Sequence, residues 1–197
     1  MKILSAVFHS SAPDLTACPV HDRPEFAFIG RSNVGKSSLI NLLTGHGRLA
    51  KVSGTPGKTR LINFFTINNR WSLVDLPGYG YAKVAKGERY KFNEAVADYL
   101  EGRPNLANVF VLIDSRLPPQ ALDLEFIRWL AATEAPFDLV FTKADKQSAN
   151  QTASNVAAFK RALADADVAA PRAFVSSATK GKGRAEILAR ISELLDA

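Results

Sequence analysis

The segment from Gly30 to Ser37 reads GRSNVGKS and holds the residue types and spacing that bind a phosphate chain. It matches G-x-x-x-x-G-K-[ST] at every fixed position. In that pattern backbone N–H groups surround the β-phosphate, Lys36 reaches the β- and γ-oxygens, and the Ser37 hydroxyl ligates Mg2+. The N-terminus of the following helix also favours an anion. The sequence therefore predicts a nucleotide-binding protein with these phosphate-site residues: Gly30, Arg31, Ser32, Asn33, Val34, Gly35, Lys36, Ser37 and Ser38.

The base is predicted from the segment TKAD at 142–145, which follows an apolar stretch over 137–141 and looks like the guanine-recognition element [NT]-K-x-D. The Asp145 carboxylate can accept hydrogen bonds from the ring N–H and the exocyclic amine of guanine, and adenine offers no such pair. A site built to hydrogen-bond a missing donor rejects the wrong ligand by about 10⁴ or more. Thr142 stands where many related segments carry Asn, so we expect a weaker tie to the phosphate-binding loop. The predicted base-site residues are Thr142, Lys143, Ala144 and Asp145.

A second contact with the base is expected after the apolar stretch 173–175. The tripeptide SSA there is similar to a segment that contacts the guanine O6 through backbone N–H groups, and its assignment depends on its order in the chain. Its residues are Ser176, Ser177 and Ala178.

Two further segments are expected to sense the γ-phosphate. DLPG, which ends the apolar stretch 71–74, matches D-x-x-G, in which Asp75 holds a Mg2+ water and the Gly78 N–H meets the γ-phosphate. GTPGKT over 54–59 is a Gly/Pro loop of the kind that a ligand orders. Thr59 is expected to close over Mg2+, and Thr55 is the competing candidate. The residues assigned to these segments are Gly57, Lys58, Thr59, Arg60, Leu61, Asp75, Leu76, Pro77 and Gly78.

The predicted reaction is in-line attack of water on the γ-phosphate, in which catalysis is largely positioning and charge stabilisation. The predicted catalytic residues are Lys36, Thr59 and Gly78, and the predicted Mg2+ ligands are Ser37, Thr59 and Asp75. Position 79 holds Tyr79 in place of a water-orienting Gln, so slow intrinsic turnover is expected. Arg60 as an arginine finger in cis is a weaker alternative, because an exposed basic residue needs no catalytic explanation.

Strands alternating with amphipathic helices predict an α/β fold. We expect a three-layer P-loop GTPase domain (G domain), with a mostly parallel sheet, one antiparallel edge strand and helices on both faces. Asn68 and Asn69 tolerate left-handed conformations and predict a hairpin between 60–67 and 70–76. Asp114 follows the central strand 109–113 and either lines the nucleotide crevice or caps its own loop, and we favour the cap. Apolar residues at helical spacing predict four core-facing helices, around 92–100, 122–130, 156–163 and 187–195.

Length and composition favour one domain. The chain has 197 residues and 47% hydrophobic content, enough for one substantial core. We expect an N-terminal strand segment over about 1–22, a nucleotide-binding core over 25–183 and a C-terminal helix over 184–197. The lone Cys18 excludes an intrachain disulfide and is expected only to pack. No stretch approaches the length of a membrane-spanning helix, so membrane anchoring is not expected.

Charge is concentrated in one part of the chain. The net charge is +6, yet residues 48–91 hold nine basic side chains against Asp75 and Glu88. Such a patch attracts a phosphate backbone, and Tyr79 and Tyr81 could stack on bases or pack against a protein. Solubilising charge on exposed loops remains the alternative. Lys180, Lys182 and Arg184 either extend the patch or only decorate the last loop.

The segments GRSNVGKSSLIN, PGKTRLINFF, LVDLPGYGYA and TKADK resemble the EngB (YihA/YsxC) family of bacterial ribosome-biogenesis GTPases, in the Era-like, TrmE-related group. The resemblance runs from about Glu25 to Gly183. It implies assembly of the large ribosomal subunit, a cytoplasmic setting and a requirement for normal cell division and septation. In potassium-activated relatives the position of Asn33 supplies a carbonyl oxygen to K+, so K+ or the ribosomal particle is expected to accelerate hydrolysis.

Three functions stay open at this stage. The first is a GTP-driven switch, working as a monomer on ribosomal RNA of the large subunit. The second is a signalling or division GTPase that acts on a protein partner. The third is a small-molecule kinase with a P-loop, which the guanine-selecting TKAD and the lack of a substrate lid disfavour.

Overall fold

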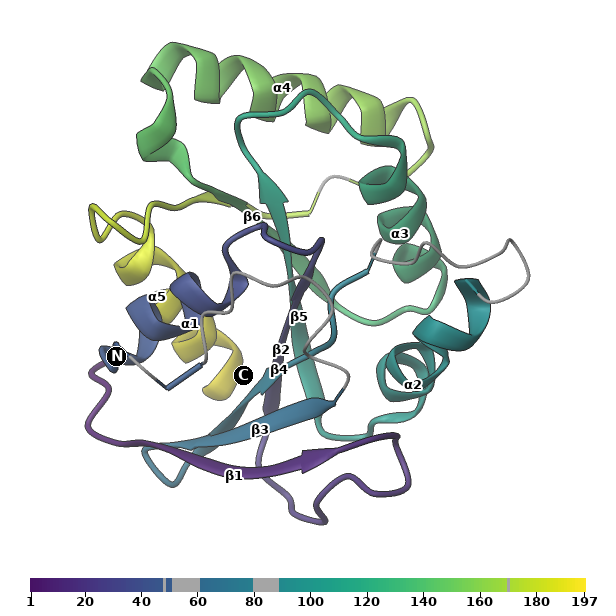
Figure 1. The fold of residues 1–197 in the computed structure, drawn as a ribbon, viewed down its shortest axis with the longest axis vertical. Coiled ribbons are helices and arrows are strands. Elements are labelled where there is room, and N and C mark those ends of the chain that lie inside the picture. The colour runs from purple at the N-terminus through teal and green to yellow at the C-terminus, as the bar shows by residue number, and fades with distance from the viewer. Residues whose placement is uncertain (48, 51–60, 80–88, 170) are drawn as a thin grey trace.

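The computed structural model describes residues 1–47, 49–50, 61–79, 89–169 and 171–197, except for the side chains of 89–93. Strands and helices alternate along most of the described chain (Figure 1). The elements are β1 (Ala6–Ala12), β2 (Glu25–Gly30), α1 (Lys36–Thr44), β3 (Ile62–Ile67), β4 (Trp71–Asp75), α2 (Arg89–Gly102), β5 (Leu106–Asp114), α3 (Ala121–Ala132), β6 (Phe137–Thr142), the 3-10 turn η1 (Ala144–Lys146), α4 (Ala149–Ala164), β7 (Ala173–Val175) and α5 (Arg184–Leu195).

The strands form a seven-stranded sheet in the order β1-β3-β4-β2-β5-β6-β7. The strands β2, β4, β5, β6 and β7 run parallel, whereas β3 pairs antiparallel with both β4 and β1. The predicted mostly parallel α/β fold is therefore confirmed. Its reversed strand is β3, which lies one position inside the edge, and β1 covers it as the outermost strand.

Helices cover both faces of the sheet (Figure 1). Alternate residues along β2 point to opposite faces, as the period of two in a strand requires. Phe26 and Phe28 pack with apolar residues of α1 and α5, whereas Ala27 and Ile29 pack with those of α2, α3 and α4. Both faces of the central strands are buried, so these strands read as continuous apolar runs rather than alternating ones. No helix in the described ranges is long and apolar enough to cross a membrane.

The hairpin between β3 and β4 forms at the predicted residues. Asn68 and Asn69 both have positive φ, 51° and 53°, and the Arg70 N–H donates to the carbonyl of Ile67 at 2.9 Å, as the two central positions of a type I′ turn require. The Asn68 side chain also accepts hydrogen bonds from the backbone N–H groups of Leu4 and Ser5 and donates to the carbonyl of Lys2. The turn therefore also fixes the chain that leads into β1.

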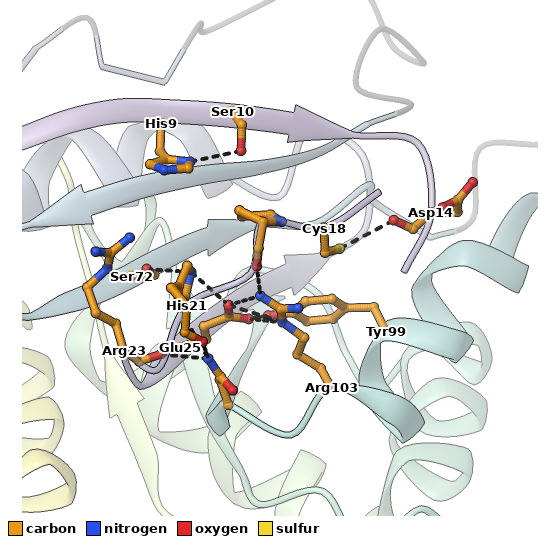
Figure 2. Close-up of polar contacts among 12 residues, drawn as sticks. His9, Ser10, Asp14, Cys18, His21, Arg23, Glu25, Ser72, Tyr99 and Arg103 are labelled. Carbon is orange, nitrogen blue, oxygen red and sulfur yellow. Dashed lines mark hydrogen bonds and ion pairs between the residues drawn. The ribbon is translucent and has the colours of Figure 1, made fainter. Parts of the chain in front are cut away.

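A buried polar cluster closes the end of the sheet at which β2 begins (Figure 2). Glu25 is completely buried. Its carboxylate accepts a hydrogen bond of 2.6 Å from the Tyr99 hydroxyl and several from the Arg103 guanidinium, the shortest also 2.6 Å. His21 lies 3.2 Å from the same carboxylate, and burial lowers the pKa of its imidazole. The cluster therefore joins the last turn of α2 to the first residue of β2.

The chain between β1 and β2 packs around this cluster. Arg103 donates to the carbonyl of Pro19, and Asn105 donates to the carbonyl of His21. Cys18 is a buried free thiol whose Sγ lies 3.3 Å from the carbonyl of Asp14, and burial raises its pKa to about 11. The thiol is therefore protonated at neutral pH and packs, as expected from the sequence.

Glu25→Gln is expected to lower the free energy of unfolding by about 3 kcal/mol, because it leaves the Arg103 charge buried without a counter-charge. Urea denaturation of the purified protein measures the loss. The matched control is Asp196→Asn, which breaks the ion pair of Asp196 with Arg70, whose side chains are 61% and 56% exposed. This exposed pair should contribute less than about 1 kcal/mol. Equal losses in the two variants would contradict the assignment of Glu25 as a buried anchor.

Candidate nucleotide-binding site

The predicted site residues within the described ranges lie in the loops at the carboxyl ends of the parallel strands. The P-loop (residues 30–37) follows β2, and the DLPG segment includes the last residue of β4 and the loop after it. Asp114 ends β5, the TKAD segment begins at the last residue of β6, and Ser176 follows β7. Because β2 lies between β4 and β5, its loop has a predicted site segment on each side. Ligands of open α/β sheets bind at such a position.

Glycine is required in the P-loop where the chain is crowded or left-handed. A Cβ at Gly30 would lie 2.8 Å from the carbonyl oxygen of Leu112 on β5. Gly35 has a φ of 107°, which side chains rarely adopt, and it caps the N-terminus of α1. A glycine cap has no side chain to accept from the first N–H groups of the helix. These groups are the donors that an anion would use.

The Lys36 ammonium and the Asp75 carboxylate form an ion pair in which both side chains are largely buried. Gly78 packs against the P-loop, since a Cβ on it would lie 2.8 Å from the carbonyl oxygen of Gly30. Lys36, Asp75 and Gly78, three of the residues predicted to meet the phosphates and Mg2+, are thus drawn together around the P-loop.

The TKAD segment is bound to the P-loop by two side chains. The Thr142 hydroxyl donates to the carbonyl of Val34 at 2.6 Å, so this tie exists although Thr142 replaces Asn. The Lys143 ammonium donates to the carbonyl of Asn33 at 2.6 Å and to Asp114 at 2.9 Å. Lys143 therefore connects the loops after β2, β5 and β6.

Asp114 caps its own loop, which is the role that we favoured from the sequence, and it also pairs with a residue of the TKAD segment. Its carboxylate accepts from the Arg116 backbone N–H at 3.1 Å, which is the expected loop cap, and it also pairs with Lys143 beside the P-loop. Burial alone would raise the pKa of Asp114, but the hydrogen bonds from Arg116 and Lys143 outweigh it and lower the pKa to about 2. This carboxylate is therefore charged across the physiological pH range and keeps Lys143 in place.

Asp145 is oriented by the loop that follows β7. The Ser177 hydroxyl donates to the Asp145 carboxylate at 2.7 Å, and this bond lowers the pKa of Asp145. The carbonyl of Ser176 accepts from the Ala144 N–H at 3.1 Å, which aligns the two loops. Backbone hydrogen bonds between Ser177 and Lys182 close the loop behind them. The two segments predicted to read guanine are thus brought together, and the second oxygen of Asp145 lies 3.5 Å from the ammonium of Lys146, whose side chain is 58% exposed.

Several predicted residues fall outside the described part of the chain. They are Thr55, Gly57, Lys58, Thr59 and Arg60, together with Tyr81 and most of the basic side chains between 48 and 91. Leu61 is described and is 41% exposed. Arg184 donates to the carbonyl of Leu42, so it ties α5 to α1, whereas Lys180 and Lys182 are exposed.

The expectation that Tyr79 stacks on bases or on a protein partner is wrong. Tyr79 is only 2% exposed, and its ring stacks on Phe126 of α3, with centroids 4.3 Å apart and planes at 16°. Its hydroxyl donates to Asp123 at 3.0 Å. The basic residues on either side of it in sequence suggested a surface position, but the ring fills a gap between the loop after β4 and α3.

Sequence reasoning missed Asp123, a buried acid on the helix that covers this part of the site. A signal was present, because Asp123 precedes Phe126 and Ile127 by three and four residues and so lies on the apolar face of α3. A charged residue on a core-facing stripe is rarely buried without a partner.

The oxygen atoms beside the P-loop suit a Mg2+ ion that is held mainly by the phosphates of a nucleotide. No group of three or more His, Cys, Asp or Glu side chains in the described ranges could hold a metal alone. The Ser37 hydroxyl and the Asp75 carboxylate offer hard oxygen atoms beside the P-loop, and Mg2+ in nucleotide sites uses one or two such groups plus phosphates and water.

Ser177→Ala is expected to weaken GDP binding about tenfold, because Asp145 loses the hydrogen bond that orients it. Isothermal titration calorimetry measures this affinity. The matched control is Ser148→Ala: Ser148 caps α4 by accepting from the Gln151 N–H, and its loss should cost about 1 kcal/mol of stability without weakening GDP binding. The same affinity loss in both variants, or none in Ser177→Ala, would contradict the orienting role of Ser177.

Comparison with known proteins identifies the family. A family model described as 50S ribosome-binding GTPase matches residues 25–143. Proteins named Probable GTP-binding protein EngB from Flavobacterium psychrophilum and Cytophaga hutchinsonii are 53% and 51% identical to the chain. The two alignments cover 98% and 97% of the chain and 95% and 96% of the relatives.

A solved structure shows the same fold. The crystal structure of a probable GTP-binding protein engB aligns with a TM-score of 0.66 at 24% identity, covering 87% of this chain and 98% of that one. The chain belongs to the EngB family of GTP-binding proteins, among the 50S ribosome-binding GTPases.

Proposed function

We propose that the protein hydrolyses GTP to GDP, and that it acts as a Mg2+-dependent switch in assembly of the large ribosomal subunit. The observation behind the proposal is that the Ser177 hydroxyl orients the Asp145 carboxylate through a hydrogen bond of 2.7 Å. This carboxylate lies at the same end of the sheet as the P-loop. A fixed carboxylate suits the paired donors of guanine, because each of its oxygens can accept more than one hydrogen bond. The relatives' name and the family description support the same function.

In this mechanism the P-loop amides and the N-terminus of α1 bind the phosphates. When the nucleotide binds, the Lys36 ammonium leaves the Asp75 carboxylate and contacts the β- and γ-phosphate oxygens instead. The Asp75 carboxylate is then free. Ser37, Thr59 and Asp75 would hold Mg2+, which when bound would neutralise charge on the phosphates. The Gly78 N–H meets the γ-phosphate. Lys143 and Asp114 keep the P-loop and the base-binding loop in register.

Intrinsic hydrolysis should be slow, because the buried Tyr79 hydroxyl donates to Asp123 and does not orient a water. We propose that K+ or the ribosomal particle supplies the missing stimulation. The Asn33 backbone carbonyl already accepts from Lys143, so a K+ ion would use the exposed side-chain oxygen of Asn33. Equal turnover in KCl and NaCl would contradict the K+ part of this proposal.

The charge distribution of the chain and its family membership both support a ribosomal binding partner. The nine basic residues between 48 and 91 flank the segments that contact the γ-phosphate, so nucleotide exchange would change how they meet a phosphate backbone. We propose that the chain acts in the cytoplasm as a monomeric single G domain. A requirement for normal division and septation would then follow from ribosome supply or from a separate protein partner.

The test is co-sedimentation of the purified protein with large ribosomal subunits, in a non-hydrolysable GTP analogue and in GDP, across a range of salt concentrations. We expect binding with the analogue that weakens steeply as salt rises, because neutralised phosphates release counterions. Small ribosomal subunits serve as the control for nonspecific attraction to RNA. Absence of binding to large subunits in both nucleotides would contradict the ribosomal role. A partner complex that resists RNase would then favour the division GTPase.

A further inference from the structure

One buried carboxylate on α3 contacts both loops that are proposed to surround the γ-phosphate. Asp123 is 1% exposed. Its Oδ1 accepts from the Tyr79 hydroxyl at 3.0 Å and lies 3.0 Å from Nε of Arg31, the second residue of the P-loop. The P-loop, through the charge of Arg31, and the residue directly after the DLPG segment, through a hydrogen bond, therefore both contact the same oxygen atom of a third element.

The backbone reinforces this link. Arg31 and Tyr79 form an isolated parallel bridge, which extends the pairing direction of β2 and β4 beyond the ends of the strands. Gly78 is the residue directly before Tyr79, and it is so close to the P-loop that a Cβ would lie 2.8 Å from the Gly30 carbonyl oxygen. Fixing Tyr79 therefore also fixes the position of the Gly78 N–H.

The tyrosine ring is held as firmly as its hydroxyl. It stacks on Phe126, one helical turn after Asp123 on the same face of α3. Burial and the neighbouring Asp123 raise the pKa of the Tyr79 hydroxyl well above its ordinary value, so it remains a donor at neutral pH. The second oxygen of Asp123 has no hydrogen-bond partner among the described residues. The Tyr79 hydroxyl and the Arg31 charge are thus the contacts that the described structure offers to offset burial of this carboxylate.

We propose that Tyr79, Asp123 and Arg31 form a latch that positions the Gly78 N–H for the γ-phosphate and thereby favours the triphosphate over the diphosphate. The inference rests on the proposed function, since it requires that Gly78 senses the γ-phosphate. Without the latch, the segment after Asp75 spends part of its time away from the P-loop. The apparent affinity for the triphosphate is then the intrinsic affinity multiplied by the fraction of molecules that are competent to bind. GDP has no γ-phosphate to meet Gly78, so its affinity depends much less on this fraction.

The chain contains a matched control for the loss of a buried tyrosine hydroxyl. Tyr99 is also fully buried and donates to a buried carboxylate, that of Glu25, at 2.6 Å. It lies at the end of the sheet where β2 begins, whereas the P-loop follows the other end of β2 (Figures 1 and 2). Tyr99→Phe and Tyr79→Phe remove the same chemical group from similar surroundings, and Tyr79→Phe alone removes it from the latch.

The experiment measures the Kd of GDP and of a non-hydrolysable GTP analogue by calorimetry, for the wild-type chain, Tyr79→Phe and Tyr99→Phe, with Mg2+ present. Thermal unfolding of each protein is recorded in parallel. In Tyr79→Phe the preference for the analogue over GDP should fall about tenfold, the equivalent of one hydrogen bond to a charged group. In Tyr99→Phe the melting temperature should fall while the preference stays at the wild-type value.

Asp123→Asn provides a second variant, since it keeps the size of the side chain and removes the charge that holds Arg31. We expect the same loss of preference for the GTP analogue over GDP. If Tyr79→Phe does not fold, Asp123→Asn tests the latch in its place. An unchanged preference in the latch variants, or an equal change in Tyr99→Phe, overturns the latch while the proposed function stands. A wild-type chain that binds neither nucleotide overturns the proposed function and the latch with it.

Discussion

Parallel strands end at the same edge of a sheet, and the candidate site depends on this constraint more than on any single residue. The strands β2, β4, β5, β6 and β7 all run in one direction, so the loops that follow them meet although they are far apart in sequence. Lys143 shows the consequence most directly. Its ammonium reaches the carbonyl of Asn33, in the loop after β2, and the carboxylate of Asp114, the last residue of β5.

Charged side chains have different roles at the two ends of the sheet. At the end where β2 begins, Glu25 holds α2 through Tyr99 and Arg103 with a completely buried carboxylate (Figure 2). At the opposite end, buried and half-buried charges are paired across loops, as in Lys36 with Asp75 and Lys143 with Asp114. A ligand with phosphates can exchange for one member of such a pair. At this end the Lys143–Asp114 pair therefore fixes the loops, whereas the Lys36–Asp75 pair remains available for exchange with a phosphate.

Much of this could be predicted from the sequence, because the motifs are local and their order in the chain follows the order of the strands. A helix follows the P-loop, over Lys36–Thr44, as the phosphate-binding pattern predicts. The Asn68–Asn69 turn follows from the tolerance of asparagine for positive φ. Roles assigned to residues 55–60 lie outside the described ranges and remain predictions.

The features that could not be predicted depend on contacts between residues far apart in the sequence, which no local pattern encodes. Tyr79 was expected at the surface because of its basic neighbours, yet its partners are Asp123 and Phe126, more than forty residues away on α3. Glu25 lies at the start of an apolar strand, and nothing nearby in sequence indicates that Arg103 neutralises it. A buried acid within an apolar pattern was the available signal in both cases.

The central claim is that the Asp145 carboxylate, oriented by Ser177 and aligned with the P-loop through Thr142 and Lys143, makes this a guanine-specific site. The most direct test is the affinity of the purified chain for GDP and for ADP in the presence of Mg2+. We predict that GDP binds and that ADP binds more weakly by about 10⁴ or more. Comparable affinities for the two nucleotides would contradict it.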